Sequence, residues 1–198
     1  MDALLLACDR LSTLVGRLFG WFIVALVALI AFEVVARYAF GTPHAWAPDV
    51  AVMAFAALFM MGGAYTLAQQ NHVRGDILYG MLAPRTQAGI DLLLYLVFFC
   101  PGVVALAWAG WGFAAESWAI GERSGSGSGG PLLYPLKALI PLAGLLLLLQ
   151  GLAEMLRCVA CLRSGQWPAR RGDVQEVDVD ELRARLGTAG PAAPEAAR

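Results

Sequence analysis

The stretch EVVARYAFGTPHAWAPD, residues 33–49, joins two long apolar segments of the chain. Glu33 and Arg37 are four residues apart, so on a helix they share one face, with the acid N-terminal to the base as a favourable pair requires. Trp46 and a proline precede Asp49 and are typical of the first turn of the next helix. Because ionisable side chains at a membrane are costly, such a cluster is a functional candidate. It could move a substrate or hold a partner.

The composition predicts an integral membrane protein. Of the 198 residues, 59% are hydrophobic and 15% are charged, and the mean hydropathy is +0.65. Soluble domains carry about 25% charged residues and about 45–50% apolar residues. The net charge of -1 argues against a nucleic-acid binder, which would need a basic face. The apolar composition instead makes membrane lipid the expected partner.

Four apolar runs predict an all-α integral membrane fold with four transmembrane helices. The expected spans cover about residues 18–37, 48–71, 88–116 and 135–160. Each is long enough to cross about 30 Å of hydrocarbon, which takes about 20 helical residues. Pro101 and Gly102, near the middle of the third span, predict a kink or a locally loosened helix.

Two segments flank this transmembrane domain, which we place at residues 18–162. Residues 1–17 have apolar side chains at helical spacing, including Leu4 and Leu11, and polar ones elsewhere, which predicts an amphipathic helix at the membrane surface. A cleaved signal peptide is the alternative, but the apolar run is long and shows no clear cleavage site. Residues 163–198 are rich in Pro, Ala, Gly and charge and predict a mostly disordered tail.

The basic residues set the expected orientation. With the N-terminus inside, eight arginines lie at the inner ends or in the tail, and three basic residues lie outside. The inner set is Arg10, Arg17, Arg74, Arg85, Arg157, Arg163, Arg170 and Arg171, and the outer set is Arg37, Arg123 and Lys137. Under the positive-inside rule, this bias places both termini in the cytoplasm.

No pattern in the chain indicates catalysis, a cofactor or a metal. His44 and His72 fall at opposite ends of helices about 30 Å long, so they cannot ligate one haem from two sides. Cys158 and Cys161 form a CxxC without the second pair that a zinc site needs. No nucleophile is paired with a base. We therefore expect no catalytic residue, no cofactor and no metal.

The remaining polar residues are candidates for anchoring the helices. His72 and Asp76, within HVRGD after the second span, indicate a hydrogen-bonded turn or a docking surface. Glu116 closes the third span near Lys137, and the glycine- and serine-rich residues 122–131 between them read as a flexible linker. Gln150, a lone amide in an apolar run, needs a hydrogen-bond partner on another helix. The tryptophans Trp46, Trp108, Trp111 and Trp118 fit an outer aromatic belt.

Together these features resemble the small membrane subunit of tripartite ATP-independent periplasmic (TRAP) transporters, over about residues 10–162. The resemblance is carried by Arg37 and Tyr38, by Pro43 and Trp46 before Asp49, by HVRGD at 72–76, by Glu116 and Ser117, and by KALIPLAGLLLLLQGLAE at 137–154. The chain departs from the family in having Asp49 where glutamate is common, and in its plain Gly-Ser loop.

The resemblance implies a non-enzymatic subunit in a bacterial inner membrane. A periplasmic binding protein would deliver an organic acid or similar solute to a large membrane subunit, which carries the sodium and substrate sites. The small subunit would be the scaffold for that elevator-like partner. We expect its contacts, or the closure of its own first hairpin, at Glu33, Arg37, Tyr38, Trp46, Asp49, His72, Asp76, Glu116, Lys137 and Gln150.

Two other functions stay open from the residues alone. The chain could be a self-sufficient small transporter, with Glu33 as the carboxylate that couples a proton or cation. It could also be a membrane electron carrier or enzyme.

Overall fold

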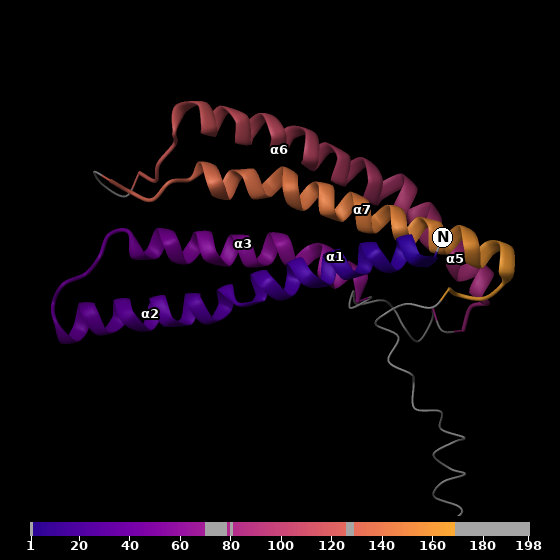
Figure 1. Cartoon of the computed structure of the whole chain (residues 1–198), viewed down its shortest axis with the longest axis horizontal. Helices are drawn as coiled ribbons and strands as arrows, with labels where there is room; N and C mark the ends of the chain where they lie inside the picture. The colour runs from indigo at the N-terminus through magenta and orange to yellow at the C-terminus, as the bar shows by residue number, and fades with distance from the viewer. Residues whose placement is uncertain (1, 70–78, 80, 126–128, 169–198) are drawn as a thin grey trace, which may run out of the picture. The chain divides into compact units, whose positions relative to one another are not determined.

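The computed structural model describes residues 2–69, 79, 81–125 and 129–168, and they are almost entirely helical (Figure 1). The helices are α1 (Asp2–Gly20), α2 (Phe22–Ala39), α3 (Ala47–Ala68), α5 (Pro84–Leu94), the π-helix η1 (Tyr95–Phe99), α6 (Cys100–Ile120) and α7 (Tyr134–Ser164). Within these described residues, four helical runs are long and apolar enough to cross a membrane. The described residues contain no β-strand, only an isolated bridge between Arg123 and Leu132. The predicted fold class is confirmed.

The helices extend further than the sequence indicated. The third helical run begins at Pro84 and ends at Ile120, and α7 continues to Ser164, past the expected end of the transmembrane domain. Pro84 fits the first turn because its missing N–H has no intrahelical partner there. Gly121 ends α6 with a φ of 60°, which only glycine adopts at no steric cost. His72, Asp76 and most of the predicted tail lie outside the described residues.

The four spanning helices form a row. α2 packs against α3, α3 against α7, and α7 against α6, and Figure 1 shows them in this order. α2 and α3 form one helical hairpin and α6 and α7 form another, and the two helices of each hairpin run antiparallel (Figure 1). In a closed four-helix bundle the two ends of the row, α2 and α6, would also pack together. Among the described residues, extensive contacts join only neighbours in the row. The shorter helices α1 and α5 pack against the row at one end. Most side chains of α2 and α6 therefore face outward.

Small residues let α6 and α7 approach closely. A Cβ added to Gly144 would lie 3.0 Å from the Ala107 Cβ, and one added to Gly110 would lie 2.7 Å from an Ile140 methyl carbon. In lipid, helices gain little from burying apolar surface, so association depends on this kind of close packing. The glycines in these two helices therefore fix where they cross.

The third helical run contains a π-turn just before its proline. The π-helix η1 at Tyr95–Phe99 directly precedes α6, whose second residue is Pro101. Proline has no N–H to donate to the carbonyl four residues earlier, and its ring clashes with that carbonyl, so the helix widens here. The locally loosened helix predicted from Pro101 and Gly102 is confirmed.

The N-terminal helix turns its polar side toward the other helices. α1 packs against α3 and α7, with Asp9, Ser12 and Thr13 buried, while Leu4 and Leu14 are exposed. Gly16 makes this approach possible, because a Cβ there would lie 2.3 Å from the Tyr65 Cβ. The side of α1 that packs against α3 and α7 is therefore the polar one, because its polar side chains Asp9 and Ser12 find partners on α7. That α1 lies along a membrane surface stays a prediction.

Candidate functional site

Polar contacts gather at both ends of the row of helices. We call the end that carries residues 40–46, 121–125 and 129–133 the loop end, and the end that carries the start of α1 and the last part of α7 the terminal end (Figure 1). The outer clasp (Glu33, Arg37 and His44) lies at the loop end. The inner network (Asp9, Ser12, Gln150, Glu154 and Arg157) lies toward the terminal end.

The outer clasp forms where the chain turns back after α2. Gly41 has a φ of 66°, and the Thr42 N–H donates to the Ala36 carbonyl at 3.0 Å. This turn carries His44 back over the last turns of α2. There its backbone N–H donates to the Glu33 carboxylate at 3.1 and 3.3 Å.

Glu33 is the acceptor for every contact of the clasp. Arg37 Nη2 donates to Glu33 Oε1 at 3.1 Å, and His44 Nδ1 lies within hydrogen-bonding distance of Glu33 Oε2, at 3.1 Å. The Glu33 side chain is only 11% exposed, whereas that of Arg37 is 50% exposed. The predicted Glu33–Arg37 pair is confirmed. The role of His44 was missed, because a backbone donor brought in by a turn leaves no spacing signal.

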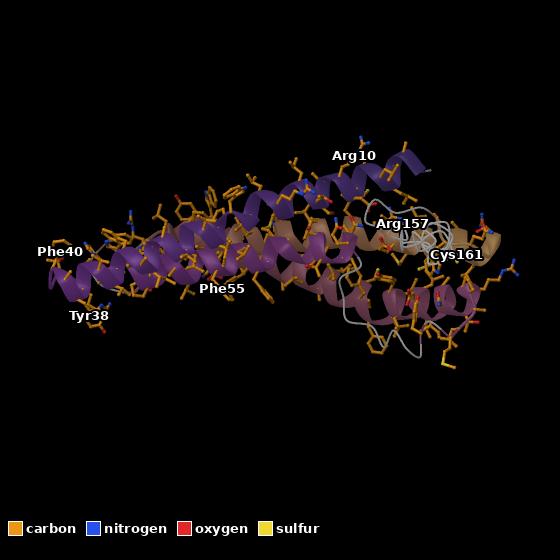
Figure 2. The ribbon with its side chains drawn as sticks, turned by 90° about the horizontal axis from the view of Figure 1, so that it is seen from below. Arg10, Tyr38, Phe40, Phe55, Arg157 and Cys161 are labelled. Atoms are coloured by element: carbon orange, nitrogen blue, oxygen red, sulfur yellow. The ribbon has the colours of Figure 1, made fainter. Side chains whose placement is uncertain are left out.

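The other predicted residues of this stretch surround the clasp. Trp46 is the N-cap residue of α3, with its ring centroid 5.6 Å from that of His44. Tyr38 is 83% exposed, and Figure 2 shows it at the loop end, pointing away from the ribbon. A groove of about 280 Å³ opens beside them between α2 and α3, lined in part by Arg37, Tyr38 and Ala47. The stretch 33–49 thus closes one hairpin and exposes two polar side chains beside a groove.

The loop between α6 and α7 ties the two hairpins together. Its two stems pair: the Ser124 N–H donates to the Pro131 carbonyl, and the Leu133 N–H to the Glu122 carbonyl, both at 2.9 Å. The Ser124 hydroxyl donates to the Asp49 carboxylate in the first turn of α3. The expectation of a wholly flexible linker is wrong for these stems, because backbone pairing and the contact with Asp49 order them.

Lys137 pairs with Glu122, a carboxylate that the sequence did not single out. It forms its ion pair with Glu122, and its ammonium lies 3.9 Å from the centroid of the Phe113 ring. Glu116 is exposed instead, one turn before the end of α6. Glu116 lies on the exposed side of α6, whereas Glu122 lies in the first stem of the loop that follows α6, where it contacts Lys137 at the start of α7. That Glu116 lies near Lys137 stays a prediction, and the ion pair of Lys137 is with Glu122.

This ion pair predicts a loop that opens in acid. The Lys137 ammonium holds the pKa of the Glu122 carboxyl below its ordinary value of 4.5. A carboxyl with a lowered folded-state pKa stabilises the fold above its unfolded pKa, and this contribution is lost as the pH falls through the folded value. We expect the protection of the Leu133 amide from hydrogen exchange to fall as the pH drops below about 4.5, the ordinary pKa of a glutamate carboxyl. In Glu122→Gln the protection should be lower throughout and should not change over this range; an unaltered pH dependence would contradict the assignment.

The inner network joins α1 to α7 through fully buried charges. Arg157 donates to the carboxylates of both Asp9 and Glu154, with Arg157 Nη2 2.6 Å from Asp9 Oδ2. The side chains of all three are at most 2% exposed. Figure 2 places Arg157 between the helices, whereas Arg10, the neighbour of Asp9, points away from them.

Gln150 completes this network. Its Nε2 donates to Asp9 Oδ1 at 2.9 Å, and its Oε1 accepts from the Ser12 hydroxyl at 2.9 Å. The prediction that Gln150 bonds across helices is confirmed. The network as a whole was missed, although a signal exists: positions 150, 154 and 157 share one face of α7, and 9, 12, 13 and 16 share one face of α1.

Both clusters are suited to holding helices together. Their acids are met by bases, amides and N–H groups of the same chain, which lowers the cost of charge in lipid. Within residues 2–69, 79, 81–125 and 129–168, no three His, Cys, Asp or Glu side chains are placed to hold a metal ion. Cys158 and Cys161 are buried in a small cluster with Ala88.

Fold and sites together define a multi-pass membrane protein, with four helices of spanning length and apolarity in the described part of the chain. A family model described as "Tripartite ATP-independent periplasmic transporters, DctQ component" matches residues 26–161. The chain therefore belongs to this family and is a small component of a tripartite transporter, which also includes a large membrane subunit and a binding protein. Comparison with curated proteins gives no significant match. The resemblance seen in the sequence is confirmed.

Proposed function

We propose that this chain is the small permease subunit of a sodium-coupled secondary transporter that imports organic acids or similar solutes. In this proposal it is a fixed scaffold for the large subunit, which moves in an elevator-like way. The large membrane subunit is its direct partner, and the periplasmic solute-binding protein reaches it only within the complex. The complex lies in a bacterial inner membrane.

The row of helices is the observation that supports a scaffold. A translocation path needs protein on all sides, whereas in the described residues α2 and α6 each pack extensively against one spanning neighbour. The charged side chains of the clasp and the network are bound to one another rather than directed at an open site. A row of this kind offers two broad faces to lipid and to a larger partner.

Orientation follows from the basic residues. With the loop end in the periplasm, Arg10, Arg17, Arg85 and Arg163 lie at the cytoplasmic end. Arg157 belongs to the buried network and does not count as a flanking charge. The bias remains without it, so both termini are cytoplasmic in this proposal.

The exposed residues beside the clasp are proposed contacts with the large subunit. Arg37 keeps half of its side chain accessible although it pairs with Glu33, and Tyr38 is almost fully exposed. Both line the groove between α2 and α3. Glu33, Trp46 and Asp49 would hold the hairpin in the shape that presents them, while His72 and Asp76 remain candidates from sequence alone.

Co-purification and reconstitution test this function. The tagged chain should bring down a much larger membrane protein from native membranes, and solute uptake into proteoliposomes should need both subunits and a sodium gradient. Uptake by this chain alone would contradict the scaffold role.

Glu33→Gln separates the scaffold from a self-sufficient transporter. The scaffold role predicts a lower yield of complex, because the carboxylate that accepts from Arg37 and His44 is weakened. A self-sufficient transporter predicts full assembly with uptake abolished. For the third possibility, a haem Soret band in the purified chain would indicate an electron carrier.

A further inference from the structure

A second groove lies between α6 and α7, on a part of the row that the clasp does not reach. Its volume is about 560 Å³, and its lining is apolar, with Val104, Trp108, Trp111 and Gly112 from α6 and Leu145 and Leu148 from α7. No helix of the described part of the chain covers it.

Two tryptophan side chains that line this groove are exposed. Trp108 is 84% exposed and Trp111 is 66% exposed. Trp108 lies eight residues before Glu116, the last charged residue of α6, which is about 12 Å along a helix. Belt tryptophans sit at the headgroup level. The spacing along α6 places Trp108 further from the loop end than Glu116 and Trp118, so an aromatic belt that includes Trp118 does not by itself account for Trp108. Exposed tryptophans beside a concave surface are typical anchors of protein interfaces.

Gly112, which has no side chain, would let the backbone of another helix approach α6 closely at this groove. A Cβ added there would meet nothing within 4 Å, in contrast to Gly110, whose missing side chain makes room for Ile140. Trp108 and Gly112 are four residues apart and lie on the same face of α6. A bulky side chain next to a small one is a shape into which another helix packs, because the small residue lets the backbones approach.

Glu116 adds a charge at the outer end of the same face. It is four residues beyond Gly112 and exposed, and no contact is seen for it among the described residues. The two basic residues that follow it in the chain are engaged elsewhere, since Lys137 pairs with Glu122 and Arg123 donates to the Gly130 carbonyl. A carboxylate one turn inside a membrane helix is stabilised by a cation.

We propose that this groove receives a transmembrane helix of the large membrane subunit. The partner helix would place a small residue against Gly112, beside Trp108, and a lysine or arginine near Glu116. This proposal deepens the proposed function and rests on it, because it assumes a large membrane partner. It adds a second contact surface, on the opposite edge of the row from the clasp.

Filling the groove tests the proposal directly. The full-length chain carrying Gly112→Leu is co-expressed with the large subunit, and the complex is quantified after affinity purification. We expect the variant alone to unfold at the wild-type temperature and the amount of complex to fall about tenfold or more, which corresponds to about 1.4 kcal/mol of binding free energy. Gly102→Leu is the matched control: it also meets nothing within 4 Å on the same run, and it does not line the groove.

Photo-crosslinking identifies the occupant. A photoreactive phenylalanine analogue replaces Trp108 in the co-expressed complex. A crosslink to the large subunit supports the proposal, whereas crosslinks only to a second copy of the chain or only to lipid overturn it. If wild type purifies with the large subunit and Gly112→Leu does so equally well, the groove is not the docking site and the scaffold role stands. If wild type fails to bind the large subunit at all, both proposals fall.

Discussion

Arg157→Leu is expected to lower the free energy of unfolding by about 3–5 kcal/mol, the cost of removing one partner from a buried ion pair. Arg157 is fully buried and donates to Asp9 and Glu154, so its loss leaves two carboxylates without their cation. Thermal unfolding of the purified chain in detergent measures the change. We expect a sharply lower midpoint or no recoverable folded protein.

Two comparisons make this prediction specific. Arg163→Leu removes an exposed arginine from the same helix and should leave the unfolding midpoint nearly unchanged. The triple variant Asp9→Asn, Glu154→Gln, Arg157→Leu removes the stranded charges as well, so it should recover part of the stability. A wild-type midpoint for Arg157→Leu would show that the network does not hold α1 to α7.

Gly16→Leu should separate α1 from α3 and cost about 1–3 kcal/mol, the range for overpacking. The first atom of the new side chain would lie 2.3 Å from the Tyr65 Cβ. Because both atoms are attached directly to the backbone, no side-chain rotation relieves the clash. The helices must move, and the contact of Asp9 with Arg157 stretches with them. The unfolding midpoint and the susceptibility of α1 to proteolysis report the result.

Gly20 offers the matched control for this change. It lies four residues further along α1, and a Cβ there meets nothing within 4 Å. Gly20→Leu should therefore behave like wild type, since it adds the same side chain to the same helix without a clash. Equal loss of stability in both variants would mean that α1 is sensitive to leucine for reasons unrelated to Tyr65.

The two polar clusters and the close-packed glycines have one physical origin. Lipid tails are as apolar as leucine, so a row of apolar helices gains little from apolar burial. Specific association then comes from small residues at the crossings, such as Gly110 and Gly144, and from hydrogen-bonded charges near the ends. The row holds its shape through a few contacts, which explains why single substitutions are expected to matter.

The sequence by itself determined the membrane class, the four spans, the Glu33–Arg37 pair, the loosened helix before Pro101 and the need of Gln150 for a partner. These follow from local rules: the length of apolar runs, the i,i+4 geometry of a helix, the missing N–H of proline and the cost of an unsatisfied amide in lipid.

Only the tertiary structure decided which residues meet across helices. It brought His44 to Glu33, Glu122 rather than Glu116 to Lys137, and Asp9 to Arg157. Asp9 and Arg157 are separated by most of the chain, and periodicity gives each helix a polar face but not the partner of that face. That choice depends on how the helices cross, which the glycines set by how closely each pair of backbones approaches.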